Sequence, residues 1–226
     1  MEAFGRAVAL GYRFVETDVR ATRDGVAVVF HDASLRRLTG TAVAVEALAW
    51  RDLATVRVGG AAVVPRLEEL LAAWPGVRVN VDVKADAAVA ATVATVRRCG
   101  AGRRVLLASF SDARLARLRA LAPDLPTSLG RRGVAALRWA SWTGRRVRLP
   151  ESVVAAQVPV AAYGVPVVDA RFVRYVHRLG LQVHVWTVDR PEQMEALLDL
   201  GVDGLMTDRL EVLREVYRRR GCWRDQ

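Results

Sequence analysis

The chain has 226 residues, of which 52% are hydrophobic, and a formal net charge of +10. This length and apolar content suit one large α/β domain better than two small ones, so a single domain over residues 1–226 is predicted. The two cysteines, Cys99 and Cys222, lie far apart, and neither has a Cys or His neighbour at metal-binding spacing. The sequence therefore offers neither a disulfide framework nor a zinc site.

The basic excess comes almost wholly from arginine, because Lys84 is the single lysine. The arginines are scattered through the predicted helices instead of forming one aromatic-laced stripe, so nucleic acid is not the expected partner. No stretch stays apolar for the roughly 18 or more residues that a transmembrane helix needs. The chain also opens without a basic-then-apolar signal peptide, and the expected location is the cytoplasm.

A helix is expected over 2–10, and from there short β-branched runs alternate with helical patterns. Strands are expected at 13–19, 77–84, 105–110, 126–130, 155–159, 182–188 and 203–208. Helices are expected at 86–98, 111–122, 169–180, 191–201 and 209–220. Repeated strand and helix imply parallel strands with right-handed crossovers, hence a doubly wound sheet or a (β/α)8 barrel.

Residues 22–25, TRDG, interrupt this rhythm. A parallel crossover needs about a dozen residues, so the run 28–30 must return antiparallel to the preceding strand through an Asp-Gly turn. Side chains alternate along a strand, which puts Glu16 and Asp18 on one face. The returning strand is expected to bring His31 close to both.

The residues that follow, 33–65, are rich in Gly, Ala and Val and are predicted to be an insertion over the mouth of the fold, with a short helix near 50–56. Without the hairpin return, seven barrel strands can be counted. Because a helix precedes the first of them, the eighth strand of a barrel is expected before Met1, which makes this an N-terminally truncated barrel.

In the run 77–84, VRVNVDVK, the polar residues Asn80, Asp82 and Lys84 share one face. In a barrel this face is the lumen, and the carboxyl ends of the strands carry the active site. Carboxylates that converge there repel one another unless a cation neutralises them. An all-oxygen set suits Mg²⁺ or Ca²⁺, and a metal beside a lysine makes a pocket for an anion such as phosphate. A plain buried salt bridge between Asp82 and Lys84 is the alternative.

Several stretches in this order resemble the glycerophosphodiester phosphodiesterase family. They are VETDV, TRDG, VVFHD followed by SLRRLTG, VPRLEELL, NVDVK, ASF and VWTVDRPEQMEALLDLGVDGLMTD, and they span about Glu2 to Asp208. The resemblance implies a (β/α)8 barrel that uses a divalent cation to hydrolyse glycerophosphodiesters to glycerol 3-phosphate and an alcohol.

The resemblance also implies roles for single residues. Metal ligands would be Glu16, Asp18 and Asp82, the last in place of the family's usual glutamate; His31 would be catalytic; Lys84 would contact phosphate, and Phe110 and Trp186 would line the mouth. The family's other catalytic histidine belongs to a His-Arg pair on the first strand, which would lie before Met1. Two alternatives stay open: an impaired barrel that binds anions, and a phosphodiesterase acting on the headgroups of lysophospholipids or sphingomyelin.

Overall fold

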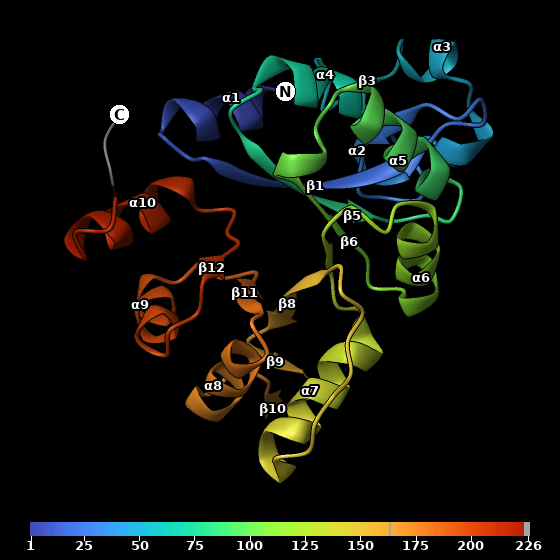
Figure 1. Cartoon of the computed structure of the whole chain (residues 1–226). Helices are drawn as coiled ribbons and strands as arrows, with labels where there is room; N and C mark the ends of the chain where they lie inside the picture. Colours follow the sequence, from blue (N-terminus) through green and yellow to red (C-terminus); the bar gives the residue numbers. More distant parts are fainter. Residues whose placement is uncertain (163, 224–226) are drawn as a thin grey trace. The chain divides into compact units, whose positions relative to one another are not determined.

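A computed structural model describes residues 1–162 and 164–223 (Figure 1). The chain divides into two compact units, each with its own strands and helices. Unit 1 comprises Met1 and Arg13–Pro126, and unit 2 comprises Glu2–Tyr12 and the chain from Thr127 onward. None of the helices in the described ranges is long and apolar enough to cross a membrane.

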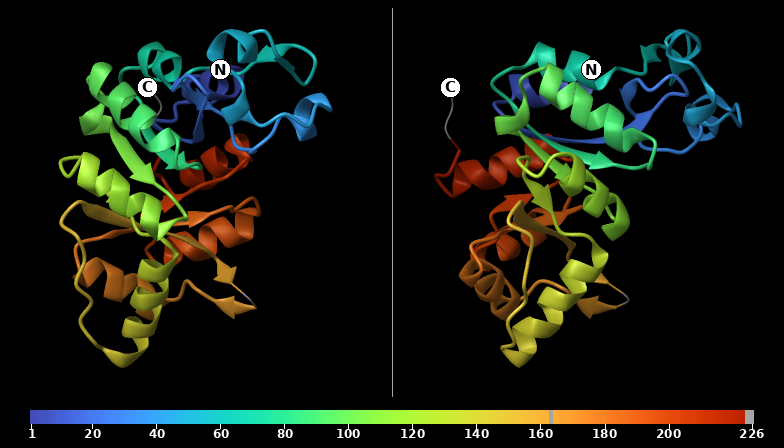
Figure 2. Two further views of the ribbon diagram at one scale, coloured as in Figure 1. Left: turned by 90° about the vertical axis from the view of Figure 1, so that its right-hand side faces the viewer. Right: turned by 45° about the vertical axis from the view of Figure 1, so that its right-hand side comes forward.

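Unit 1 is built on four strands in the order β2-β1-β5-β6. Strand β1 pairs antiparallel with β2 and parallel with β5, and β5 pairs parallel with β6. The bounds are β1 Phe14–Ala21, β2 Ala27–Val29, β5 Arg78–Val83 and β6 Val105–Ala108, with helices α4 Leu67–Ala73, α5 Ala88–Arg98 and α6 Asp112–Leu121. Helix α5 connects the parallel strands β5 and β6 as a crossover. It packs on β1, β2 and β5 (Figure 2).

The turn between β1 and β2 confirms the predicted antiparallel return. Gly25 has a φ of +79°, a left-handed conformation that glycine adopts without steric cost. The Thr22 hydroxyl donates to Asp24 Oδ1 at 2.6 Å, and the backbone N–H of Trp50 donates to the same oxygen at 2.8 Å. The aspartate thus closes the turn and ties it to the segment that follows β2.

That segment has a small core of its own, as an insertion should. It contains α2 Arg36–Thr39, the 3-10 turn η1 Val45–Ala47, α3 Trp50–Leu53, and the short paired strands β3 Arg57–Val58 and β4 Ala62–Val63. Its buried residues form one cluster with two residues of the hairpin: Val28, Phe30, Leu35, Val45, Leu53 and Val64. The insertion therefore stabilises the strand that leads to His31.

Unit 2 has four parallel strands that are connected and flanked by helices. The strands run β7-β8-β11-β12, with bounds β7 Thr127–Ser128, β8 Val153–Pro159, β11 Gln182–Trp186 and β12 Gly204–Leu205. The helices are α1 Glu2–Ala9, α7 Arg131–Thr143, α8 Ala170–Arg178, α9 Pro191–Asp199 and α10 Leu210–Arg219, and a short hairpin joins β9 Ala161–Ala162 to β10 Val165–Pro166. Its core is a continuous apolar cluster centred on fully buried Phe172, Val183, Val185 and Met194.

Every predicted strand is present, although those predicted at 126–130 and 203–208 shorten to two residues each in β7 and β12. Helix α7 and the β9–β10 hairpin were not predicted. In α7 the core-facing residues are Leu137 and Ala140, but the bulky Trp139 and Trp142 are exposed. Large apolar residues on both faces weaken the 3.6-residue periodicity by which a helix is recognised.

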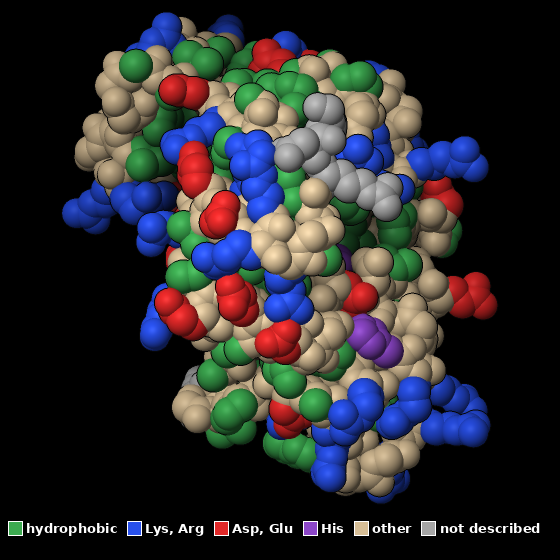
Figure 3. All heavy atoms as spheres, turned by 90° about the vertical axis from the view of Figure 1, so that its left-hand side faces the viewer, with side chains coloured by type: hydrophobic (Ala, Val, Ile, Leu, Met, Phe, Trp, Pro, Cys, Tyr) green, Lys and Arg blue, Asp and Glu red, His purple; other side chains and the backbone are tan. Residues whose placement is uncertain are grey.

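The surface is charged and mixed in sign on the face drawn in Figure 3, where Lys and Arg side chains lie next to Asp and Glu over most of the view. Ion pairs of unit 2 include Arg219–Glu195 and Arg220–Asp199, both at 2.8 Å. Such exposed pairs contribute little to stability. These ion pairs do neutralise the positive charge of the arginines that take part in them.

Replacing Leu53 with Ala tests the core of the insertion. Leu53 is fully buried there, so we expect the free energy of unfolding to fall by about 2–5 kcal/mol through lost burial and a cavity. Urea denaturation followed by circular dichroism measures this loss. The exposed Val63→Ala is the matched control and should leave the midpoint nearly unchanged; equal effects of both changes would contradict a packed insertion.

Candidate active site

Strands β1 and β5 carry polar side chains on a common face. Their register pairs Glu16 with Asn80 and Asp18 with Asp82. Since paired residues of neighbouring strands point to the same side of a sheet, the three carboxylates share one face, as the period-two pattern predicted. Asp18 and Asp82 are direct cross-strand neighbours, and Glu16 lies two residues before Asp18 on β1.

The opposite face of these strands is apolar. Thr17 and Val19 of β1 and Val81 and Val83 of β5 are buried, and α5 packs on both strands. The polar face is therefore the one turned away from α5. This arrangement fixes the carboxylates on two rigid, hydrogen-bonded strands.

Lys84 joins the two aspartates. It follows β5, where its backbone N–H donates to the Val19 carbonyl at 2.9 Å. Its Nζ lies 2.8 Å from Asp18 Oδ1 and 2.7 Å from Asp82 Oδ2. The same ammonium lies 5.1 Å from the ring centroid of Phe110, within cation–π range. Lys84, Asp18, Asp82 and Phe110 thus form one contact cluster, which includes the salt bridge between Asp82 and Lys84 that the sequence left as the alternative.

The pKa values of the cluster follow from burial and from this pairing. Burial raises the pKa of Asp82, and the hydrogen bond from Lys84 opposes that rise only in part. Burial lowers the pKa of Lys84, but its hydrogen bonds to Asp18 and Asp82 outweigh burial and the pKa is raised. Lys84 is therefore charged at neutral pH. Lys84 is shared between the two aspartates.

A hard divalent cation fits this donor set chemically. All the candidate ligands are carboxylate oxygens, and Oδ1 of Asp82 is buried without a hydrogen-bond partner among the described residues. However, within residues 1–162 and 164–223 no group of three or more His, Cys, Asp or Glu is arranged to hold a metal. Glu16, Asp18 and Asp82 thus share a face without forming such a group, and Lys84 pairs with both aspartates.

His31 follows β2 directly and is held by the backbone. The N–H of Phe30 donates to the Asp18 carbonyl at 2.9 Å, and Arg20 Nε donates to the His31 carbonyl at 3.0 Å. The imidazole is 64% exposed, and its Nδ1 lies 2.7 Å from Asp32 Oδ1. The hairpin therefore brings the backbone of His31 next to β1, as predicted, while the ring points to Asp32 and solvent.

Asp32 orients this ring. Asp32 forms hydrogen bonds with Arg37 and with His31. The bond from Arg37 has the larger effect on its pKa, and together the two bonds lower the pKa of Asp32 to about 2. Because the ionised carboxylate can only accept, the neutral imidazole carries its proton on Nδ1. Nε2 is then left as the basic nitrogen. Asp32 was not among the predicted site residues, although it directly follows His31 in the sequence.

Two arginines near the cluster were also missed. Arg20 lies two residues after Asp18, on the same face of β1, and also reaches Glu46 of the insertion at 3.5 Å. Arg114 donates to the Ser109 hydroxyl at 3.0 Å and to the Val83 carbonyl at 3.1 Å. The alternation of side chains along β1 could have predicted that Arg20 shares a face with Asp18. Arg114 lies on α6, and no local sequence pattern indicates that it contacts the ends of the strands.

Trp186 lies in unit 2, at the end of β11, and is half-buried. On the same face, His184 lies 3.3 Å from Gln157 Nε2 and 3.1 Å from Gln182 Oε1. Burial lowers the pKa of His184, which favours the neutral ring. His184 is therefore a hydrogen-bonded, partly buried histidine, and the role of Trp186 stays a prediction.

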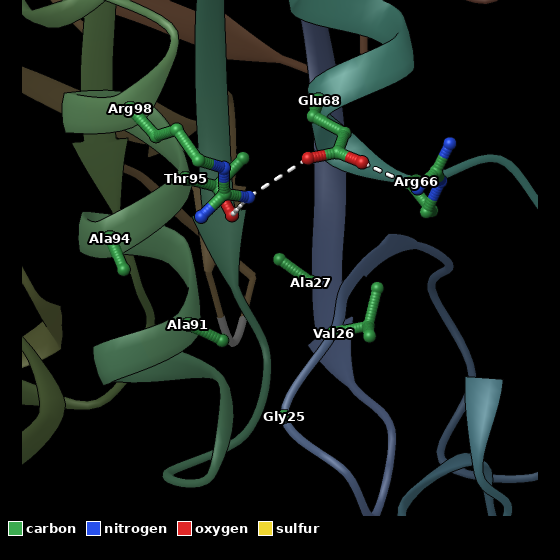
Figure 4. A pocket seen from close by; sticks show the side chains of 9 residues that line it. All are labelled: Gly25, Val26, Ala27, Arg66, Glu68, Ala91, Ala94, Thr95 and Arg98. Atoms are coloured by element: carbon green, nitrogen blue, oxygen red, sulfur yellow. Dashed lines mark hydrogen bonds and ion pairs between the residues drawn. The ribbon is translucent and has the colours of Figure 1, made fainter.

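A cavity of about 250 Å³ in unit 1 does not coincide with this cluster (Figure 4). The lining residues are Gly25, Val26, Ala27, Arg66, Glu68, Ala91, Ala94, Thr95 and Arg98. Glu68 pairs with Arg66 at 2.5 Å and with Arg98 at 2.9 Å. Each charged side chain that lines the cavity thus has an ion-pair partner, and none of the predicted site residues is among them.

Comparison with known proteins agrees with the family resemblance. The profile of the glycerophosphoryl diester phosphodiesterase family matches residues 1–212. A Mycobacterium tuberculosis protein named "Probable glycerophosphodiester phosphodiesterase 2" is 45% identical over 227 aligned positions, which cover 99% of this chain and 86% of the relative. The predicted family is therefore confirmed.

Solved structures agree in fold. A glycerophosphodiester phosphodiesterase from Agrobacterium tumefaciens matches with a TM-score of 0.78 at 23% identity, over 95% of this chain and 90% of that one. An Oleispira antarctica phosphodiesterase, solved in complex with the product sn-glycerol-3-phosphate, matches with a TM-score of 0.75 at 18% identity, over 96% and 90% of the two chains. This likeness confirms the predicted fold class, an α/β fold of the (β/α)8 barrel type.

Replacing Lys84 with Met tests the electrostatics of the cluster. The change leaves Asp82 buried without its ammonium, so we expect the free energy of unfolding to fall by about 3 kcal/mol at neutral pH. The pKa of Asp82, already raised in the fold, rises further. A carboxyl group whose pKa is higher in the folded than in the unfolded protein destabilises the fold at a pH above its unfolded-state pKa. This loss of stability disappears as the pH falls and Asp82 takes up a proton.

The loss should therefore be smaller at about pH 5 than at about pH 8 in urea denaturation. Adding Asp82→Asn to Lys84→Met should restore most of the stability, since it removes the uncompensated charge. Equal losses at both pH values, with no recovery in the double variant, would refute this account of the cluster.

Proposed function

Because the chain belongs to the glycerophosphoryl diester phosphodiesterase family, we propose that it hydrolyses glycerophosphodiesters to glycerol 3-phosphate and an alcohol, as a metal-dependent enzyme of glycerophospholipid metabolism. The observation that carries the proposal is the cluster of Asp18, Asp82 and Lys84 on the shared face of β1 and β5. It combines oxygen ligands for a cation with a charged ammonium for phosphate.

In this proposal Glu16, Asp18 and Asp82 hold a divalent cation, Mg²⁺ or Ca²⁺. Such an ion supplies stabilisation of the negative charge that gathers on the phosphoryl oxygens. The side chain of aspartate is one methylene shorter than that of the family's usual glutamate. Asp82 is therefore proposed to reach the ion through a longer contact or a bridging water.

Lys84 is proposed to bind a non-bridging phosphoryl oxygen. Its ammonium is charged, is held by two carboxylates and lies against the Phe110 ring. When the carboxylates turn to a cation, Lys84 loses partners that a phosphate oxygen can replace. Phe110, 38% exposed, is proposed to contact the alcohol group, and Trp186 is proposed for the same role.

His31 is proposed as a general acid and base. With Nδ1 held by ionised Asp32, Nε2 can accept a proton from an attacking oxygen or, once protonated, donate one to a leaving oxygen. The exposure of the ring gives it access to substrate. Arg20 fixes the His31 carbonyl and so limits movement of the backbone at this residue.

Removing metal ions tests the cofactor. With glycerophosphocholine as substrate, we expect release of glycerol 3-phosphate to fall to background in EDTA and to return when Mg²⁺ or Ca²⁺ is added. A coupled dehydrogenase assay measures glycerol 3-phosphate, and the melting temperature in EDTA controls for unfolding. Full activity after chelation would rule out metal dependence. Tight binding of glycerophosphocholine without turnover would favour the anion-binding alternative.

Replacing His31 with Ala tests the proton-transfer role. We expect kcat for glycerophosphocholine to fall by about 10²- to 10⁴-fold, with a small change in KM. The control is His177→Ala: this half-exposed histidine also pairs with an aspartate, Asp203 at 2.8 Å, but lies on α8 in unit 2. An unchanged rate in His31→Ala, or an equal loss in His177→Ala, would remove His31 from the mechanism.

A further inference from the structure

Helix α7 and the segment after it are strongly basic. Residues 131–150 contain no Asp or Glu and have arginine at six positions, 131, 132, 138, 145, 146 and 148. Arg138 is mostly buried and pairs with Asp169 at 2.6 Å. The remaining arginines of this stretch are exposed, so the surface here is positive without local acidic residues from the same segment.

Two tryptophans lie on the outer face of α7. Trp139 and Trp142 are three residues apart, hence neighbours on one helix face, and are 51% and 49% exposed. The guanidinium of Arg145 lies 5.3 Å from the ring centroid of Trp139, and that of Arg138 lies 4.2 Å from the ring centroid of Trp142. Aromatic and basic groups are therefore interleaved on this face, which corrects the expectation that the arginines form no stripe with aromatic residues.

The segment that carries the other arginines is held in place. The Tyr175 hydroxyl donates to the Arg145 carbonyl at 2.6 Å, and Val147 and Leu149 pack against the core of unit 2. Arg146 and Arg148 alternate with these two residues and are exposed. The arginines therefore project from a fixed backbone.

We infer that this surface, called the α7 surface and consisting of Trp139, Trp142, Arg145, Arg146 and Arg148, docks on a lipid bilayer that contains anionic lipids. Indole rings prefer the interface between water and lipid, and arginines next to them bind lipid phosphates. Their combination on one helix end is the composition of an interfacial membrane contact.

A single-stranded nucleic acid fits the α7 surface less well. Bases bind proteins by stacking on the faces of aromatic rings, and a guanidinium on one face of each indole leaves a single face of each ring for a base. The headgroup region of a bilayer accepts ring edges and guanidinium groups together. The inference is independent of the proposed activity, because none of these residues belongs to the candidate active site.

Co-sedimentation with vesicles tests the inference on the full chain. We expect binding to vesicles of phosphatidylcholine mixed with phosphatidylglycerol, weakened by salt, and little binding to phosphatidylcholine alone. The variant Arg145→Ser, Arg146→Ser, Arg148→Ser should lose affinity by about fivefold for each arginine removed. Trp139→Ala with Trp142→Ala should also weaken binding and should reduce the blue shift of tryptophan fluorescence that vesicles induce.

The matched control removes the same charge from unit 1, with Arg36→Ser, Arg51→Ser and Arg103→Ser, all exposed. It should keep most of the affinity, and every variant should keep its melting temperature and its rate on soluble glycerophosphocholine. Three results would overturn the inference: no binding of the unaltered chain to anionic vesicles, equal losses in both triple variants, or binding to a fluorescent single-stranded RNA without binding to vesicles.

Discussion

Two carboxylates in register on neighbouring parallel strands are the constraint on which the candidate site depends. The pairing of Asp18 with Asp82 brings their side chains together on one face, and burial of Asp82 makes its charge costly. Only positive charge makes such a pair tolerable. Lys84 provides it in this structure, and in the proposed mechanism a divalent cation would share that role.

The hairpin and the insertion extend this site beyond the two strands. Residues Val28 and Phe30 of the returning chain are buried in the insertion, while Arg20 reaches both the His31 carbonyl and Glu46. The position of His31 therefore depends on packing that is remote from the carboxylates. The proposed general acid and base lies on an irregular segment that is supported from both sides.

Features with local causes could be predicted from the sequence. β-branched runs located the strands, alternation placed Glu16, Asp18 and Asp82 on one face, and the Asp-Gly turn gave the antiparallel return. Features with non-local causes could not. The orientation of His31 depends on Asp32 and Arg37, Arg114 reaches the strand ends from α6, and α7 escaped detection because Trp139 and Trp142 lie on its exposed face.

The shared core of hairpin and insertion has a consequence for engineering and for evolution. Val28 and Phe30 pack among Leu35, Val45 and Leu53. Residues 33–65 therefore cannot be exchanged for the corresponding segment of another protein without regard to β2. A chimera that takes this segment from a homologue must take β2 with it, or the new interior will not match the old strand. Substitutions at the buried positions of residues 33–65 are thereby restrained by the shapes of Val28 and Phe30, two side chains that come just before His31.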